Sequence, residues 1–425
     1  MINKSSFLTQ LFSYTGFQAI NKIVPFLILP ILTRYFSKEE VGYYTLYQTL
    51  ILIIFPILTI SLQNAVSINY FRLEKTRFIR YFSNVIIVAF FTCILGTLLY
   101  LFTGSFIANK IDFPYIWLLI TILTVFPQFL LQLRLTLSRN QGRIIHFGTY
   151  TILNTFLTNG LGLLFVFFSP LSWEGLVLGI FIGGIILSVF CIYSFYKEHL
   201  IVYKKSIGFI KDAIKIGLPI SFHQIGSWFS NTFNRIVINV LLGTAATGSY
   251  GVGSVYGMIM TFIQDSFNLA YTPYLFNVLK NNENNTQFKL VKMSFIFYIS
   301  IFTVAFLVFL CGIFFTGIIF GDNYLDTKQL ILPLILAAMI NGFYKIHVNY
   351  LFYYKKTLSI AKITFVLGLL NIPLAYILVK YWGMLGAAYS VLCIQFFSYL
   401  FILFQANKIY PMNWRKNIGY ILSNK

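Results

Sequence analysis

Charged residues are scarce in this chain, and acidic residues are the scarcest. Only 10% of the 425 residues are Asp, Glu, Lys or Arg, whereas a soluble domain carries about 25%. Eleven residues are acidic and 58% are hydrophobic. This composition excludes a soluble globular protein and predicts a membrane protein.

Cysteine and histidine are also rare, with four of each. The cysteines all lie inside apolar runs and show neither metal-ligand spacing nor a disulfide framework. No P-loop, HExxH motif, nucleophile elbow or complete GxGxxG is present. We therefore expect no catalytic residues, no metal and no organic cofactor.

The apolar runs are continuous and about as long as a membrane-spanning helix, which needs about 20 residues. Barrel strands would instead alternate over about 10 residues. The sequence predicts an all-α polytopic membrane protein with twelve transmembrane helices. The predicted spans are 11–33, 41–66, 79–103, 113–134, 144–168, 174–196, 214–242, 248–276, 292–319, 329–353, 360–380 and 383–406.

Basic residues set the predicted orientation. Of the 31 lysines and arginines, 23 fall on the face that holds both termini, five on the other face and three within spans. By the positive-inside rule both termini are cytoplasmic. The net charge of +20 then reflects topology and contacts to anionic lipids, so we expect no nucleic-acid partner. The first run lacks a cleavage site and is not expected to be a signal peptide.

Paired turn motifs indicate an internal duplication. Gly42 and Gly248 follow the first and seventh spans at an offset of 206, and Trp173 and Trp382 precede the sixth and twelfth at an offset of 209. Chance similarity of glycine and aromatic residues at membrane turns is the alternative. The predicted domains are an N-terminal six-helix lobe, 1–196, a basic cytoplasmic linker, 197–213, and a C-terminal six-helix lobe with a short tail, 214–425.

A lysine lies in the middle of the first span. Lys22 at bilayer depth costs about 2.5–3.5 kcal/mol on insertion scales. Gln18, Asn21 and Pro25 recur at spacings of three and four and share its helical face. Such a polar stripe faces a bundle interior or a watery cavity. A lysine paired only for stability is the alternative.

The seventh span carries a second polar face, formed by Gln224, Asn231, Asn234 and Arg235. Arg235 lies about 10 Å below the outer surface at 1.5 Å per residue. Arginine offers a phosphate a bidentate fork, and lysine offers a mobile point charge. We expect Lys22 and Arg235 to face a cavity and to bind an anionic group at different depths, with the five amides of the two stripes beside them.

Asp265 is the one acid that falls in the interior of a predicted span, away from its ends. Lys345, in another span, lies at nearly the same depth. Equal depth predicts a structural ion pair between them.

The run from Asn21 to Tyr44, which includes Ser37-Lys38-Glu39-Glu40-Val41-Gly42, resembles the opening signature of bacterial polysaccharide-biosynthesis membrane proteins, the Wzx-type O-antigen flippases. Ile216-Gly217-Leu218-Pro219-Ile220, Asn234-Arg235 and Gly248-Ser249-Tyr250 are similar to the start of their second half. That family often has Asp where this chain has Asn234. The resemblance implies the fold of multidrug and polysaccharide exporters, with two pseudo-symmetric six-helix lobes around a central cavity.

The resemblance further implies a function. A flippase of this family moves an undecaprenyl-pyrophosphate-linked oligosaccharide, an O-antigen or capsule repeat unit, from the cytoplasmic to the periplasmic leaflet of the bacterial inner membrane by alternating access. Its partners are this glycan, membrane lipids, and polysaccharide polymerase and chain-length proteins. H+ or Na+ coupling stays open.

Two other functions remain as alternatives. A cation-coupled drug exporter of the same fold would rely on buried acids, whereas the predicted membrane interior here carries three cations and one acid. A membrane glycan polymerase or ligase usually has a large periplasmic loop, and no predicted outer loop exceeds roughly ten residues.

Overall fold

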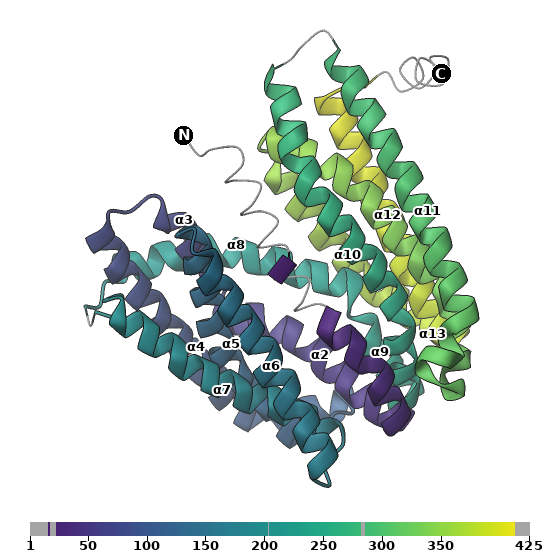
Figure 1. Cartoon of the computed structure of the whole chain (residues 1–425), viewed down its shortest axis with the longest axis horizontal. Coiled ribbons are helices and arrows are strands. Elements are labelled where there is room, and N and C mark those ends of the chain that lie inside the picture. The colour runs from purple at the N-terminus through teal and green to yellow at the C-terminus, as the bar shows by residue number, and fades with distance from the viewer. Residues whose placement is uncertain (1–15, 18–22, 203, 282–284, 413–425) are drawn as a thin grey trace. The chain divides into compact units, whose positions relative to one another are not determined.

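The computed structural model describes residues 16–17, 23–202, 204–281 and 285–412. Within these ranges every regular element is a helix and no strand occurs, which confirms the all-α prediction for this part of the chain (Figure 1). Eight of the described helices are long and apolar enough to cross a membrane. The number of twelve crossings stays a prediction.

The elements follow the predicted spans closely. The first half contains the helix Ile23–Tyr35, α2 (Lys38–Thr59), α3 (Leu62–Tyr70), α4 (Lys75–Ile111), α5 (Tyr115–Asn140), α6 (Ile144–Phe168) and α7 (Trp173–Lys197). The second half contains α8 (Ile207–Asn231), α9 (Asn234–Leu242), α10 (Thr244–Asn281), α11 (Thr286–Phe320), the 3₁₀ turn η1 (Asp322–Thr327), α12 (Lys328–Tyr353) and α13 (Thr357–Ile409).

A capping box starts α2. The backbone N–H of Glu40 donates to Oγ of Ser37 at 3.2 Å, and the backbone N–H of Ser37 donates to the Glu40 carboxylate at 2.7 Å. The two side chains thus satisfy backbone donors that the first turn leaves free. This contact explains why Ser and Glu stand three residues apart at this turn.

The predicted span 41–66 is broken into α2 and α3. Ile60 and Ser61 both adopt left-handed backbone conformations, with φ of 49° and 48°. Ser221 of α8 donates its hydroxyl to the carbonyl of Pro56 at 3.1 Å and to Oγ of Ser61 at 3.0 Å. The break is therefore held by a side chain from a helix far along the chain.

The long helix α13 is two helices that meet at Gly383. Its φ of 58° and ψ of −143° are open to glycine and not to residues with a Cβ. A Cβ on Gly386 would lie 2.9 Å from the backbone nitrogen of Val379. Residues seven apart in a straight helix are about 10 Å apart, so the chain reverses at Gly383. The two legs match the predicted spans 360–380 and 383–406.

The chain forms two compact units. The first contains residues 1–228 and 242–248, and the second contains 229–241 and 249–425. The division therefore falls inside α8, later than the predicted linker at 197–213.

Part of the predicted linker packs on α4, which accounts for this difference. Ser83 donates its hydroxyl to the carbonyl of Leu200 at 3.0 Å, and Asn84 donates its amide to the carbonyl of Lys204 at 3.0 Å. The backbone N–H of Ser206 in turn donates to Oδ1 of Asn84 at 2.9 Å. These bonds hold the segment that leads into α8 against the first unit.

Glycines bring α6 and α7 of the first unit close together. A Cβ on Gly179 would lie 2.8 Å from the carbonyl oxygen of Thr158, and a Cβ on Gly183 would lie 3.0 Å from the carbonyl carbon of Leu157. Small residues allow membrane helices this approach. This close contact between α6 and α7 sets the position of Thr158 and its neighbours on α6.

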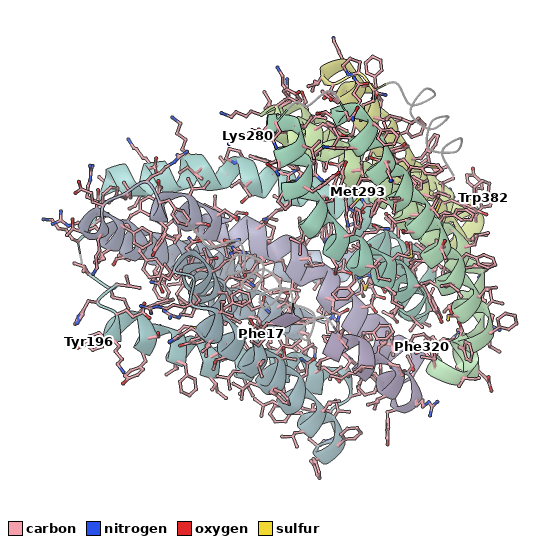
Figure 2. All side chains as sticks on the ribbon, turned by 45° about the horizontal axis from the view of Figure 1, so that its top comes forward. Phe17, Tyr196, Lys280, Met293, Phe320 and Trp382 are labelled. Carbon is pink, nitrogen blue, oxygen red and sulfur yellow. The ribbon has the colours of Figure 1, made fainter. Side chains whose placement is uncertain are left out.

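Aromatic side chains project from the surface near helix ends. Tyr196, in the last turn of α7, and Trp382, beside the reversal at Gly383, are both exposed and point outward (Figure 2). Tyrosine and tryptophan are enriched at the boundary between membrane and water. Their positions agree with helix ends that reach that boundary.

Candidate functional site

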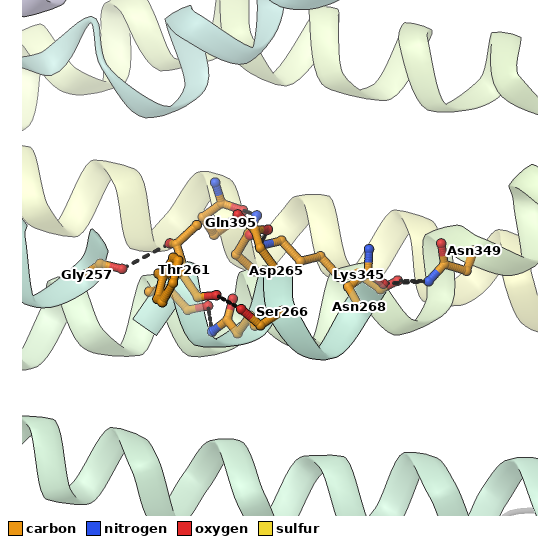
Figure 3. Close-up of polar contacts among 12 residues, drawn as sticks. Gly257, Thr261, Asp265, Ser266, Asn268, Lys345, Asn349 and Gln395 are labelled. Carbon is orange, nitrogen blue, oxygen red and sulfur yellow. Dashed lines mark hydrogen bonds and ion pairs between the residues drawn. The ribbon is translucent and has the colours of Figure 1, made fainter. Parts of the chain in front are cut away.

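An ion pair lies between α10 and α12 in the second unit. Nζ of Lys345 is 2.7 Å from Oδ1 of Asp265 (Figure 3). The lysine side chain is 16% exposed and the aspartate side chain 40% exposed. The structure thus contains the ion pair that equal depth predicts. Asp265 is neutralised by a cation of the same unit.

Polar contacts continue from this pair along the same two helices. The amide of Asn349 donates to Oδ1 of Asn268 at 2.7 Å and to the carbonyl of Lys345 at 2.9 Å (Figure 3). The hydroxyl of Thr272 donates to Oδ1 of Asn349 at 3.3 Å. The amides therefore position the backbone that carries Lys345.

A second chain of amides begins at Asn231, which the sequence places on a polar stripe. Gln395 of α13 donates its amide to Oδ1 of Asn231 at 2.6 Å, and Asn341 of α12 donates to Oε1 of Gln395 at 3.0 Å. Asn231 is exposed. The sequence reading missed Gln395 and Asn341, because a single amide in an apolar helix forms no periodic stripe.

Asn234 has a different environment from the one predicted. It is fully buried, and its amide donates to the carbonyl of Ala387 at 2.7 Å and to the hydroxyl of Ser390. Asn371 donates to Oδ1 of Asn234 at 2.7 Å. These bonds join α9 to both legs of α13. In this conformation Asn234 stabilises helix packing and does not face a cavity.

Arg235 is also buried, with 7% of its surface exposed. Its Nη2 donates to Oγ of Ser254 on α10 at 2.9 Å. The structure therefore places the guanidinium against a neighbouring helix of its own unit. Binding of an anion by Arg235 stays a prediction.

The remaining predicted residues belong to the first unit. Gln224 accepts a hydrogen bond from the hydroxyl of Ser61 at 3.0 Å, so it takes part in the contact that holds the break between α2 and α3. Gln18, Asn21 and Lys22 lie outside the described residues. Their roles stay predictions.

The first unit contains a polar pocket of about 300 Å³. It lies among the helix Ile23–Tyr35, α2, α5, α6 and α7. Its lining residues are Pro25, Tyr44, Gln48, Pro127, Gln128, Leu131, Gln132, Asn154, Thr158, Asn159, Ile180 and Gly184. Pro25 is the described member of the first span's polar stripe, so that face of the helix reaches the pocket.

Three amides of this pocket make no hydrogen bond to another described residue. Among the described residues, the side-chain amides of Gln128, Gln132 and Asn154 have no hydrogen-bond partner. Asn159 by contrast donates to the carbonyl of Thr155 at 2.8 Å. The sequence reading missed this pocket, because several helices each contribute only a few polar residues to it.

No acid lines the pocket among the described residues. The acids of the first unit stand at or near helix ends; they are Glu39, Glu40, Glu74, Asp112, Glu174, Glu198 and Asp212. Residues 1–22 contain no Asp or Glu either. The pocket therefore has amide and hydroxyl groups and no carboxylate.

One buried cation of the first unit has a structural contact. Arg134 is fully buried, and its Nη1 lies 2.8 Å from Oε1 of Glu198. Arg143 binds the same carboxylate oxygen at 2.9 Å, and the ring of Tyr150 lies 5.5 Å from the Arg134 guanidinium carbon. Arg134 thus has a structural role as well as a place in the charge bias, because its ion pair with Glu198 connects α5 to the end of α7.

The family model for polysaccharide biosynthesis proteins matches residues 7–279. The chain belongs to this family. The resemblance carried by the opening signature is confirmed. This chain is similar to a Lsg locus protein of Haemophilus influenzae, with 23% identity over 389 residues that cover 89% of this chain and 94% of that protein. An uncharacterized membrane protein of Haemophilus influenzae is 25% identical over 355 residues, which cover 80% and 82% of the two chains.

Solved structures show the fold of this family member. An inward-facing multidrug resistance MATE transporter of the MOP superfamily matches with a TM-score of 0.72 at 13% identity, covering 91% of this chain and 96% of that chain. The lipid II flippase MurJ in an inward closed conformation matches with a TM-score of 0.69 at 15% identity, covering 96% and 93%. The chain therefore has the fold of these membrane transporters.

Proposed function

We propose that this polysaccharide biosynthesis protein is a flippase. It translocates an undecaprenyl-pyrophosphate-linked oligosaccharide from the cytoplasmic to the periplasmic leaflet of a bacterial inner membrane by alternating access. The observation that carries the proposal is the distribution of charge on a transporter fold. The one acid in the interior of a predicted span, Asp265, is paired with Lys345, and no acid lines the polar pocket of the first unit among the described residues.

This distribution suits the chemistry of the cargo. A lipid-linked pyrophosphate is anionic, its glycan is polar and neutral or weakly charged, and its tail stays in lipid. Cations at membrane depth can bind the pyrophosphate, and amides can bind the hydroxyl groups of the glycan. Lys22 and Arg235 are the residues proposed for the phosphate contacts.

A cation-coupled drug exporter makes a different demand on the same fold. It needs a carboxylate that can bind and release a proton or metal ion in the membrane interior. In the first unit every acid lies at or near a helix end, so no such group lies in the interior of its predicted spans. The charge pattern therefore favours an anionic cargo over a cationic one.

Complementation of a flippase-null bacterial strain tests the proposal. Wild-type protein should restore surface polysaccharide. Lys22→Ala and Arg235→Ala should reach the membrane at normal levels and export at a reduced rate, and Lys22→Arg should retain part of the activity. Lys110→Ala is the matched control, because Lys110 is exposed at the end of α4.

The outcome decides between two functions. Full export by both alanine variants would reject phosphate binding by these cations. Absence of any export by the wild-type chain, combined with efflux of an organic cation that Asp265→Asn abolishes, would make cation-coupled drug export the better reading.

A further inference from the structure

We propose that the amide-lined pocket of the first unit binds one neutral sugar ring. The identification of that ring as part of the translocated glycan rests on the proposed function. The binding itself rests only on the chemistry of the pocket, so the two can fail separately.

The hydrogen-bonding groups of the pocket match a sugar. A sugar hydroxyl both donates and accepts, and a side-chain amide also carries two donors and an acceptor. Gln128, Gln132 and Asn154 have no hydrogen-bond partner among the described residues. They come from two helices, α5 and α6, and so can approach a ligand from two directions.

The apolar groups of the pocket match the other face of a sugar. A pyranose ring presents its C–H groups on one face, and an aromatic or aliphatic surface can cover them. Tyr44 on α2, Leu131 on α5 and Ile180 on α7 provide such surfaces around the amides. A mixed lining of a few polar groups and apolar side chains is typical of small-molecule sites.

The size of the pocket restricts its ligand. Its volume of about 300 Å³ lies at the small end of ligand sites. One ring with its substituents is therefore favoured over a longer piece of glycan. The rest of an oligosaccharide would have to extend out of the pocket.

The charge of the pocket restricts its ligand further. A buried cation needs a carboxylate or similar partner, and a buried carboxylate needs a cation. The described lining residues carry neither charge, and residues 1–22 contain no acid. Neutral sugars should therefore bind more tightly than organic cations.

Saturation-transfer NMR on the full-length chain in lipid nanodiscs tests this inference. The probes are methyl glucoside and methyl N-acetylglucosaminide, with ethidium for comparison. Both neutral glycosides should bind. Gln128→Met and Asn154→Leu should each weaken that binding by roughly two- to tenfold, because each removes hydrogen bonds to the ligand.

Two further variants test whether a loss of glycoside binding comes from the pocket or from a change in the whole protein. Gln63→Met makes the same chemical change on α3, outside the pocket, and should leave glycoside binding unchanged. Gln128→Glu keeps the size of the side chain and adds a carboxylate, so it should increase the binding of ethidium. Thermal unfolding of each variant checks that the fold is retained.

Three results would overturn the inference. They are that no neutral glycoside binds the wild-type chain, that Gln128→Met and Asn154→Leu bind as tightly as wild type, or that wild type prefers ethidium to the neutral glycosides. Complementation distinguishes this failure from failure of the proposed function. Export without glycoside binding would reject sugar binding at the pocket and leave the proposed flippase function in place. Amide-dependent glycoside binding without export would reject the flippase function and leave sugar binding at the pocket in place.

Discussion

Gly42 and Gly248 let the first turns of α2 and α10 touch. A Cβ on Gly42 would lie 2.7 Å from the carbonyl carbon of Thr244, and the carbonyl oxygen is closer still. A Cβ on Gly248 would lie 2.9 Å from the backbone nitrogen of Gly42. All of these atoms belong to the first unit. The substitution Gly42→Ala should therefore force two backbones apart.

The size of the effect follows from this geometry. An ordinary contact begins near 3.4 Å, so the backbones must separate by at least about 0.7 Å. The obstructing atoms belong to the backbone and have no rotamer to change. Overpacking of this kind typically costs about 1–3 kcal/mol. For a unit of this length we expect the midpoint of thermal unfolding to fall by roughly 2–10 °C.

Thermal unfolding of the purified chain in detergent, followed by fluorescence-detected size exclusion, measures this change. Gly160→Ala is the control, because a Cβ on Gly160 meets nothing within 4 Å. Alanine is the better helix former by about 1 kcal/mol, so this variant should unfold at the same temperature or higher. A Gly42→Ala midpoint equal to that of wild type would refute the argument from backbone contact.

Three other substitutions test contacts described above. Asp265→Ala should destabilise the second unit by about 1–3 kcal/mol, between the values for exposed and buried ion pairs. Asp265→Lys combined with Lys345→Asp should recover part of this loss in a double-mutant cycle. Equal stability of all variants would exclude a structural pair. Gly383→Ala should lower the free energy of unfolding by about 1–3 kcal/mol, because the backbone conformation at this position excludes a Cβ. An unchanged midpoint of thermal unfolding would show that the reversal does not require glycine. Ser221→Ala should lower the free energy of unfolding by about 1 kcal/mol, because it removes the hydrogen bonds at the α2–α3 break. Protease sensitivity at the break should rise. Unaltered cleavage would show that α8 does not hold the break.

Helix type and approximate bounds could be predicted from the sequence, because a continuous apolar run of membrane length permits little else. The Asp265–Lys345 contact was also within reach. A lone acid at membrane depth needs a cation, and depth along two predicted helices identified one. Both predictions depend on the membrane environment, which acts on each residue according to its depth.

The pocket and the role of Asn234 could not be predicted in this way. Periodicity shows which face of a helix is polar, but it does not show which neighbouring helix covers that face. Asn234 lies on a polar face as expected, yet Asn371 and Ser390 of α13 cover it. The pocket likewise arises only when α5 and α6 meet. Gln128 and Gln132 share one face of α5, and Asn154 and Thr158 share one face of α6, but neither spacing shows that the two faces line the same pocket.

The lengths of α4 and α11 have a consequence for the surrounding bilayer. At 1.5 Å per residue their 37 and 35 residues extend about 56 Å and 53 Å, whereas the hydrocarbon core measures about 30 Å. Each helix also has lysine or arginine near its first turns, at Arg77 and Arg80 in α4 and at Lys289 and Lys292 in α11. Long basic side chains can reach the interface from several depths. A change of several ångströms in membrane thickness would therefore shift the surplus length between headgroups and water without exposing a hydrophobic end, and such helices should be insensitive to hydrophobic mismatch.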